Sequence, residues 1–197
     1  MWGKPGAKIG ICAAGKNWLD VVHALGLLGI HETEAERLGI TTYKIGQTWP
    51  LDMTSFHEWA EGLDLIIVVE EKRKLIEVQV KEAIFDDRRG RRVYGWHKGD
   101  TWENGRQVEL FPTRYALDPV MIAAKLGGIL IEEGRRTDRI EAALGRISGV
   151  MIHYNCENRD FDLFAGQLDR IEAEFGSFLE KLEWVSLGGG IHFTGEG

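Results

Sequence analysis

The first 146 residues alternate short apolar runs with segments in which apolar residues recur at helical spacing. The apolar runs predict strands over 8–14, 41–45, 63–69 and 92–96. The helical spacing predicts helices over 18–28, 32–38, 55–62, 75–85, 119–133 and 137–144. The run over 63–69 is almost continuously apolar, which is typical of a strand covered on both faces of a parallel sheet. This alternation predicts an α/β fold, an open and mainly parallel sheet of about five strands with helices on both faces.

Residues that typically cap or end helices support these boundaries. Gly39 follows the helix expected over 32–38 and should end it. Asp118 precedes Pro119 and should cap the long helix that follows. The segment over 99–105 carries no clear period, so we interpret it as an excursion from the main fold.

The alternation of apolar runs and helical segments begins again near residue 147. An apolar run over 147–153, a helical segment over 160–182 and a second run over 184–187 form a βαβ pattern that ends in three glycines. Residues 147–197 also carry nine acidic residues against three basic ones. We therefore expect two domains, 1–146 and 147–197.

The composition narrows the class of protein. Hydrophobic residues make up 44% and charged residues 28%, as in soluble globular proteins. The net charge of −7 argues against nucleic-acid binding, and no apolar run is long enough for a membrane span, so we expect a cytoplasmic protein. Cys12 and Cys156 lie far apart without a CxxC pair, which indicates reduced thiols rather than metal ligands.

The chain up to residue 145 resembles the long-chain indolepyruvate ferredoxin oxidoreductases, within the thiamine-diphosphate-dependent 2-oxoacid ferredoxin oxidoreductases. The segments that carry this resemblance are 8–21, 43–52, 60–73 and 75–82, and the similarity spans residues 7–145. It implies a transketolase C-terminal-like domain, a non-catalytic α/β module beside the domains that bind thiamine diphosphate.

The same resemblance implies which cofactors and partners to expect. The full enzymes use thiamine diphosphate, magnesium and iron–sulfur clusters, but this sequence has no Gly-Asp-Gly motif and no set of cluster-binding cysteines. We therefore expect the isolated chain to hold no cofactor and to be inactive. Its expected partners are neighbouring domains or subunits, and self-association is expected when they are missing.

Residues 147–197 resemble a different family, the carboxynorspermidine decarboxylases, which are alanine-racemase-like barrels that use pyridoxal phosphate. The matching segments are 147–158 and 183–193. The resemblance implies that His153 stacks on the cofactor ring and that Gly188, Gly189 and Gly190 cradle its phosphate, because residues without Cβ expose their backbone N–H groups. Only about two of eight barrel strands are expected here, so we interpret these positions as vestigial and the βαβ unit as a truncated piece of a TIM-type barrel.

Three functions stay open at this point. The first is a fragment of an indolepyruvate ferredoxin oxidoreductase, the second a fragment of a pyridoxal-phosphate-dependent decarboxylase, and the third a non-catalytic packing module. Two unrelated resemblances that meet near 145–148 favour a chimera, produced by a fusion of gene fragments, by an assembly artefact, or by design or recombination.

Two turns are further candidate sites. Glu70–Arg73 follows a central strand, where open α/β sheets bind ligands, so a catalytic carboxylate competes with an interfacial or solvated turn, which we favour. Ala13–Lys16 precedes a helix but lacks the spacing of a phosphate-binding loop, so we favour a plain turn.

Overall fold

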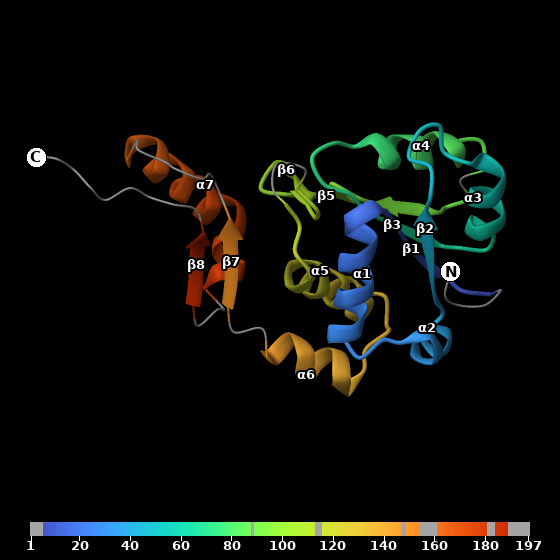
Figure 1. The fold of residues 1–197 in the computed structure, drawn as a ribbon, viewed down its shortest axis with the longest axis horizontal. Coiled ribbons are helices and arrows are strands. Elements are labelled where there is room, and N and C mark those ends of the chain that lie inside the picture. The colour runs from blue at the N-terminus through green and yellow to red at the C-terminus, as the bar shows by residue number, and fades with distance from the viewer. Residues whose placement is uncertain are drawn as a thin grey trace, which may run out of the picture. The chain divides into compact units, whose positions relative to one another are not determined.

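The computed structural model describes residues 6–87, 89–112, 116–146, 149–153, 161–180 and 184–188. The chain divides into two compact units, Met1–Leu144 and Gly145–Gly197. Figure 1 shows the helices and strands of each. The expected domains 1–146 and 147–197 stay a prediction.

The first unit is built on a parallel sheet with the strand order β2-β1-β3-β4 among its described residues. The strands are β1 (Ile9–Ala14), β2 (Ile40–Ile45), β3 (Leu65–Val69) and β4 (Arg92–Tyr94). β1 is central, because Ile9 lies opposite both Ile40 on β2 and Leu65 on β3. This confirms the α/β class and the parallel sheet.

Helices cover both faces of this sheet. One face packs against α1 (Gly15–Leu27), α2 (Glu32–Leu38), α5 (Pro119–Glu132) and α6 (Asp138–Arg146), and the other against α3 (Met53–Ala60) and α4 (Leu75–Ala83). Along β3, Leu65, Ile67 and Val69 belong to the first core, while Ile66 and Val68 belong to the second. The apolar run over 63–69 is therefore explained by burial on both sides.

The predicted helix ends are also confirmed. Gly39 adopts a left-handed conformation with φ 68° and caps α2, a geometry that glycine reaches without strain. The Asp118 carboxylate accepts hydrogen bonds from the backbone N–H groups of Val120 and Met121 at the start of α5.

The structure refines the prediction around the edge of the sheet. The described sheet has four strands rather than about five, and β4 ends at Tyr94. The segment over 99–105 is an excursion from the main sheet, as predicted, and belongs to an antiparallel hairpin of β5 (His97–Glu103) and β6 (Arg106–Glu109) that makes its own small sheet. Its turn, Asn104 and Gly105, has positive φ at both residues. The hairpin's side chains are mostly polar, so it gives no strong hydrophobic signal.

The second unit contains a parallel pair, β7 (Gly149–His153) and β8 (Trp184–Gly188), joined through α7 (Phe161–Leu179). This is the expected βαβ arrangement, with a helix somewhat shorter than the 160–182 predicted. Gln167 and Ile171, one turn apart on α7, are buried. Within the described part of the chain, no helix is long and apolar enough to cross a membrane. A cytoplasmic location stays a prediction.

Candidate functional site

The carboxyl ends of β1 and β3 are the place where this topology would bind a ligand. β2 lies on one side of β1 and β3 on the other, and open α/β sheets bind ligands at such a change of direction. Lys16 lies here at the start of α1. Its Nζ atom donates to the backbone oxygen of Leu117 at 2.6 Å and lies 2.9 Å from the Asp20 carboxylate. The hydrogen bond with Asp20 raises the pKa of Lys16.

Glu71 completes this cluster from the end of β3. Its side chain is 15% exposed and lies 3.8 Å from Lys16 Nζ. It accepts hydrogen bonds from the backbone N–H of Leu117 at 3.0 Å and from the Asn17 side chain at 3.4 Å. Lys16 and Glu71 therefore hold the loop before α5 against the ends of β1 and β3.

Glu70 has a separate structural role. Its carboxylate accepts from the backbone N–H of Ile76 at 2.8 Å and from that of Glu77 at 3.3 Å, and so satisfies free donors at the start of α4. Burial raises the pKa of Glu70, and these backbone hydrogen bonds act in the opposite direction. The two carboxylates of the turn after β3 are thus bound to backbone groups, while Lys72 and Arg73 of the same turn are exposed.

The turn at Ala13–Lys16 is a plain turn from a strand into a helix, as its sequence spacing predicts. α1 begins at Gly15, with Ala14 in an extended conformation as N-cap and no side-chain cap. Lys16, in the first turn of α1, donates to the backbone oxygen of Leu117 in the loop before α5.

A second polar cluster surrounds Trp96. Lys74 Nζ lies 3.9 Å from the centre of the Trp96 ring, and the His97 ring stacks on it at 5.0 Å. The indole N–H donates to Glu109 at 2.6 Å. Burial, followed by the charge of Lys74, lowers the pKa of His97. Sequence reasoning missed this cluster, because it depends on where the hairpin returns to the sheet.

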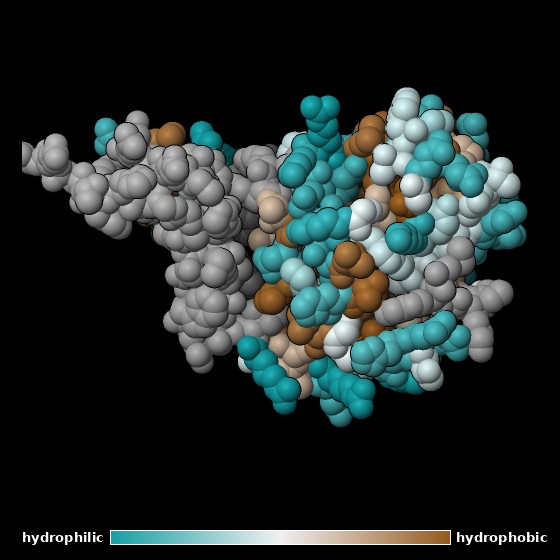
Figure 2. All heavy atoms as spheres, in the orientation of Figure 1, coloured by the Kyte–Doolittle hydropathy of each residue, from teal (hydrophilic) through white to brown (hydrophobic). Residues whose placement is uncertain are grey.

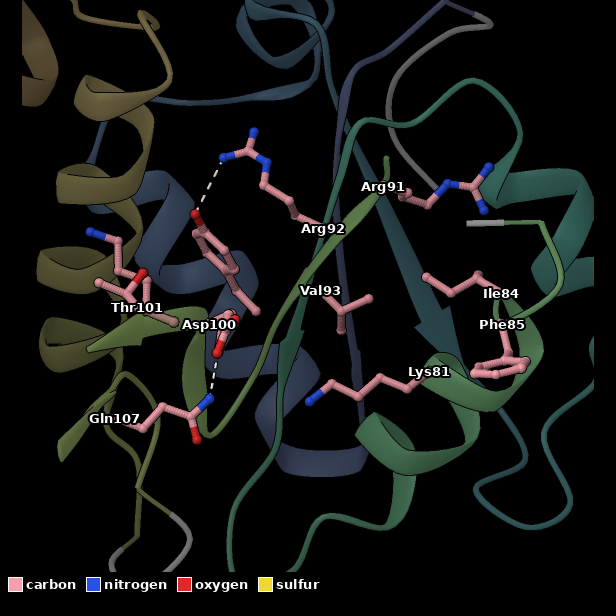
Figure 3. A pocket seen from close by; sticks show the side chains of 12 residues that line it. Lys81, Ile84, Phe85, Arg91, Arg92, Val93, Asp100, Thr101 and Gln107 are labelled. Atoms are coloured by element: carbon pink, nitrogen blue, oxygen red, sulfur yellow. Dashed lines mark hydrogen bonds between the residues drawn. The ribbon is translucent and has the colours of Figure 1, made fainter. Parts of the chain in front are cut away.

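A cleft of about 520 Å³ lies beside β4 (Figure 3). The last turn of α4 lines it with Lys81, the two residues after the helix line it with Ile84 and Phe85, and the hairpin lines it from the other side. Its basic side chains outnumber its acidic ones. Sequence reasoning missed this cleft as well, since it is formed by segments up to 26 positions apart in the chain.

No candidate metal centre is found among the described residues, since none of their His, Cys, Asp and Glu side chains forms a group of three or more that could hold an ion. Cys12 is a free thiol, completely buried, and burial raises its pKa. It is the core thiol that the sequence predicts. Cys156 lies outside the described residues.

In the second unit, the register of the strands brings two of the predicted residues together. His153 at the end of β7 lies opposite Gly188 at the end of β8. Gly189 and Gly190 lie outside the described residues. The role of these four residues as pyridoxal phosphate positions stays a prediction.

Curated relatives fall into two groups. The chain is 31% identical over 84 residues to indolepyruvate oxidoreductase subunit IorA of Thermococcus kodakarensis, which covers 43% of this chain and 12% of the relative. It is 30% identical over 93 residues to IorA of Pyrococcus horikoshii, covering 47% and 13%. It is also 52% identical over 59 residues to the carboxynorspermidine/carboxyspermidine decarboxylase of Herminiimonas arsenicoxydans, covering 30% and 16%.

These relatives are much longer than the matched segments, since the chain spans between 12% and 16% of their lengths. No solved structure matches the chain. Both resemblances seen in the sequence are confirmed, the decarboxylase one over a short segment. The family described as "Indolepyruvate oxidoreductase domain" matches residues 1–153, which is most of the chain, and the protein therefore belongs to the indolepyruvate oxidoreductase domain family.

Proposed function

We propose that the first unit is a non-catalytic packing module of a 2-oxoacid ferredoxin oxidoreductase, and that the chain by itself is inactive. The reaction of the whole enzyme would be the oxidative decarboxylation of an aryl pyruvate to an acyl-coenzyme A, with electrons passed to ferredoxin. The observation that carries the proposal is the bonding of Glu70 and Glu71, whose carboxylates bind backbone N–H groups at the usual ligand end of the sheet. Side chains that hold the fold together in this way are not available for chemistry on a substrate.

The cofactors of the whole enzyme do not fit the residues that the structure describes. Thiamine diphosphate is held through its pyrophosphate and a magnesium ion, and the sequence has no Gly-Asp-Gly motif for them. The acidic residues nearest the sheet's ligand end already accept backbone hydrogen bonds. Cys12 is inside the core, so it is not placed to bind an iron–sulfur cluster. The proposal therefore assigns cofactor binding to other domains or subunits.

Exposed apolar side chains on both sides of the sheet support a packing role. On α1, Leu19 is 67% exposed and Leu27 is 44% exposed. Figure 2 shows apolar residues on this face among polar ones. On α4, Leu75 and Val78 are exposed as well. Apolar surface of this kind is typical of contacts with other domains, and its exposure in the isolated chain favours self-association.

The inactivity is tested with the purified full chain. Indolepyruvate, coenzyme A, thiamine diphosphate, magnesium and an artificial electron acceptor are supplied together, and reduction of the acceptor is followed. We expect no turnover above that of heat-denatured protein. Turnover that is lost in Glu71→Gln would contradict the proposal, because it would assign chemistry to a residue that we place in the fold.

The packing role has a separate test in solution. At high micromolar concentration the full chain should elute as a dimer or larger species. Leu19→Glu should shift the equilibrium toward monomer, while His57→Glu, an equal charge change at an exposed position on α3, should not. A wild-type chain that stays monomeric at this concentration would count against the role.

We further propose that His153, Gly188, Gly189 and Gly190 are vestigial pyridoxal phosphate positions. The pairing of His153 with Gly188 at the ends of parallel strands supports a common origin with a phosphate cradle. A cradle without the lysine that forms the covalent link should bind the cofactor weakly. Titration of the full chain with pyridoxal 5′-phosphate, followed by absorbance, should give no saturable signal. Saturable binding that His153→Ala abolishes would refute this.

We also propose that the chain is a joined one, with its junction near 145–148, and the two unrelated sets of relatives support the joining. The family match reaches residue 153, so it includes β7 as well as the first unit. Sequencing the genomic locus across codons 140–155 tests this directly. A continuous reading frame that recurs in independent isolates would exclude an assembly artefact.

A further inference from the structure

The cleft beside β4 lies along an edge of the sheet. β4 pairs with β3 on one side, and no other described strand pairs with it on the other. Ile84 and Phe85, directly after α4, border this open side, and the β5–β6 hairpin borders it opposite, with Gly99 and Gln107. Figure 3 shows Lys81 reaching from α4 toward the space between these two borders.

The backbone of β4 presents hydrogen-bonding groups to this cleft. The N–H of Arg92 donates to the backbone oxygen of Asp64, so the backbone groups of Arg92 point toward β3. Because these groups alternate in direction along a strand, those of Val93, which lines the cleft and is 8% exposed, point away from β3. The outer edge of β4 therefore offers a donor and an acceptor to an added strand.

Side chains around the edge determine which kind of strand would fit. Phe85 is 79% exposed and lies with Ile84 on the α4 side, where it would contact apolar side chains. Lys81 and Arg92 are 52% and 43% exposed even though they pair with Glu77 and Glu133. Each has further N–H donors that a carboxylate can reach.

The charges disfavour a second copy of this chain at the edge. Antiparallel pairing of two β4 edges would bring the same basic side chains of both copies close together, and like charges opposite each other destabilise a sheet. Basic residues are a common protection against such self-pairing. Lys98, like Lys81 and Arg92, pairs with an acid outside the lining, Glu132 at 2.6 Å. The lining itself still holds four bases against one acid, Asp100, and this favours an acidic strand instead.

We propose that the outer edge of β4 receives an extended acidic segment of a partner polypeptide as a fifth strand. Main-chain hydrogen bonds to Val93 would hold the segment, and alternate side chains would contact the Ile84–Phe85 surface and the basic groups. The inference deepens the packing role proposed above, on which it rests, because it names one surface of the module and the kind of chain that it binds.

The test uses the full chain and a fluorescein-labelled octapeptide of alternating Glu and Val, with an alternating Lys and Val peptide as the reference. Fluorescence anisotropy should show saturable binding of the acidic peptide and at least tenfold weaker binding of the basic one. Lys81→Glu should weaken acidic-peptide binding at least tenfold. Lys44→Glu, the same change on the exposed face of the opposite edge strand β2, should leave it unchanged.

Hydrogen exchange on the wild-type chain gives a readout that does not depend on variants. The Val93 amide should become protected when the acidic peptide is added. Equal affinity for both peptides, no binding, or binding without protection of Val93 would overturn the inference. Protection of Val93 at high protein concentration without peptide would also overturn it, in favour of a second copy. Turnover in the enzyme assay would refute the proposed function instead and would leave these binding results unaffected.

Discussion

Replacing Gly10 with alanine should destabilise the first unit, because there is no room for a Cβ atom at this position. Gly10 lies in the central strand β1, and an added Cβ would lie 2.5 Å from Leu63 Cδ1 and 2.7 Å from the Trp59 indole. Trp59 has little freedom to move. It stacks on Tyr43 at a centroid distance of 5.1 Å, and its Nε1 donates to the Thr41 hydroxyl at 3.2 Å.

The magnitude follows from two opposing effects. Forcing an extra methyl group into a packed core costs about 1–3 kcal/mol. Replacing glycine lowers the entropy of the unfolded chain and returns about 0.4–1 kcal/mol. Gly10→Ala should therefore lower the free energy of unfolding by about 1–2 kcal/mol.

A matched control is available at Gly26 in α1. A Cβ added there meets no atom within 4 Å. Because alanine is favoured over glycine inside a helix, Gly26→Ala should raise stability by about 0.5–1 kcal/mol.

Urea unfolding of the full chain measures both changes, and native-state hydrogen exchange at the β1 amides assigns them to the first unit. The two variants should shift the urea concentration at the unfolding midpoint in opposite directions. The slope of the unfolding free energy against urea concentration should change little. A Gly10→Ala chain as stable as the wild type would refute the reasoning, since it would mean that Leu63 and Trp59 can move aside without cost.

Three further predictions concern single contacts and the division of the chain. Asp118→Ala removes the N-cap of α5 and should cost about 1 kcal/mol, measured by thermal unfolding. The hydrogen bond from Arg92 lowers the pKa of Glu133 below its ordinary 4.5, so this stabilisation is present above the unfolded-state pKa and is lost as the pH falls through the lower folded value. The melting temperature of Glu133→Gln should accordingly lie below that of the wild type at pH 7 and meet it in acid; a gap that persists in acid would argue against the pair. Trypsin should cut after Arg146, between α6 and β7, and leave a stable first unit; equal cleavage of both units would contradict this.

The elements that were predictable from the sequence depend on local signals. The apolar run of β3 needed no knowledge of its neighbours, because burial on both faces leaves a continuous pattern. Gly39 and Asp118 act through bonds within a few residues, so they too can be recognised in the sequence. The pairing of His153 with Gly188 was not predicted, since it depends on the register of two strands.

The rest depends on contacts between distant parts of the chain. The sequence places Glu70 and Glu71 after a strand, but whether they face solvent or bind backbone is decided by α4 and by the loop that contains Leu117. The β5–β6 hairpin has a weak pattern because its side chains are mostly polar. The cleft beside β4 could not be predicted without knowing where this hairpin returns.

The carboxyl ends of β1 and β3 are already used to hold the fold together. This limits which ligands the first unit could bind there. A ligand that entered between β1 and β3 would have to displace Glu71 from the N–H of Leu117 or Lys16 from the oxygen of the same residue. Breaking a hydrogen bond to a charged group and leaving its partner unsatisfied costs about 1–3 kcal/mol. It would also release the loop that positions the start of α5. The edge of β4 carries no such cost, because its outward backbone groups are not needed within the described sheet. Association at the edge is therefore compatible with the stability of this unit, whereas binding at the carboxyl ends of its strands opposes it.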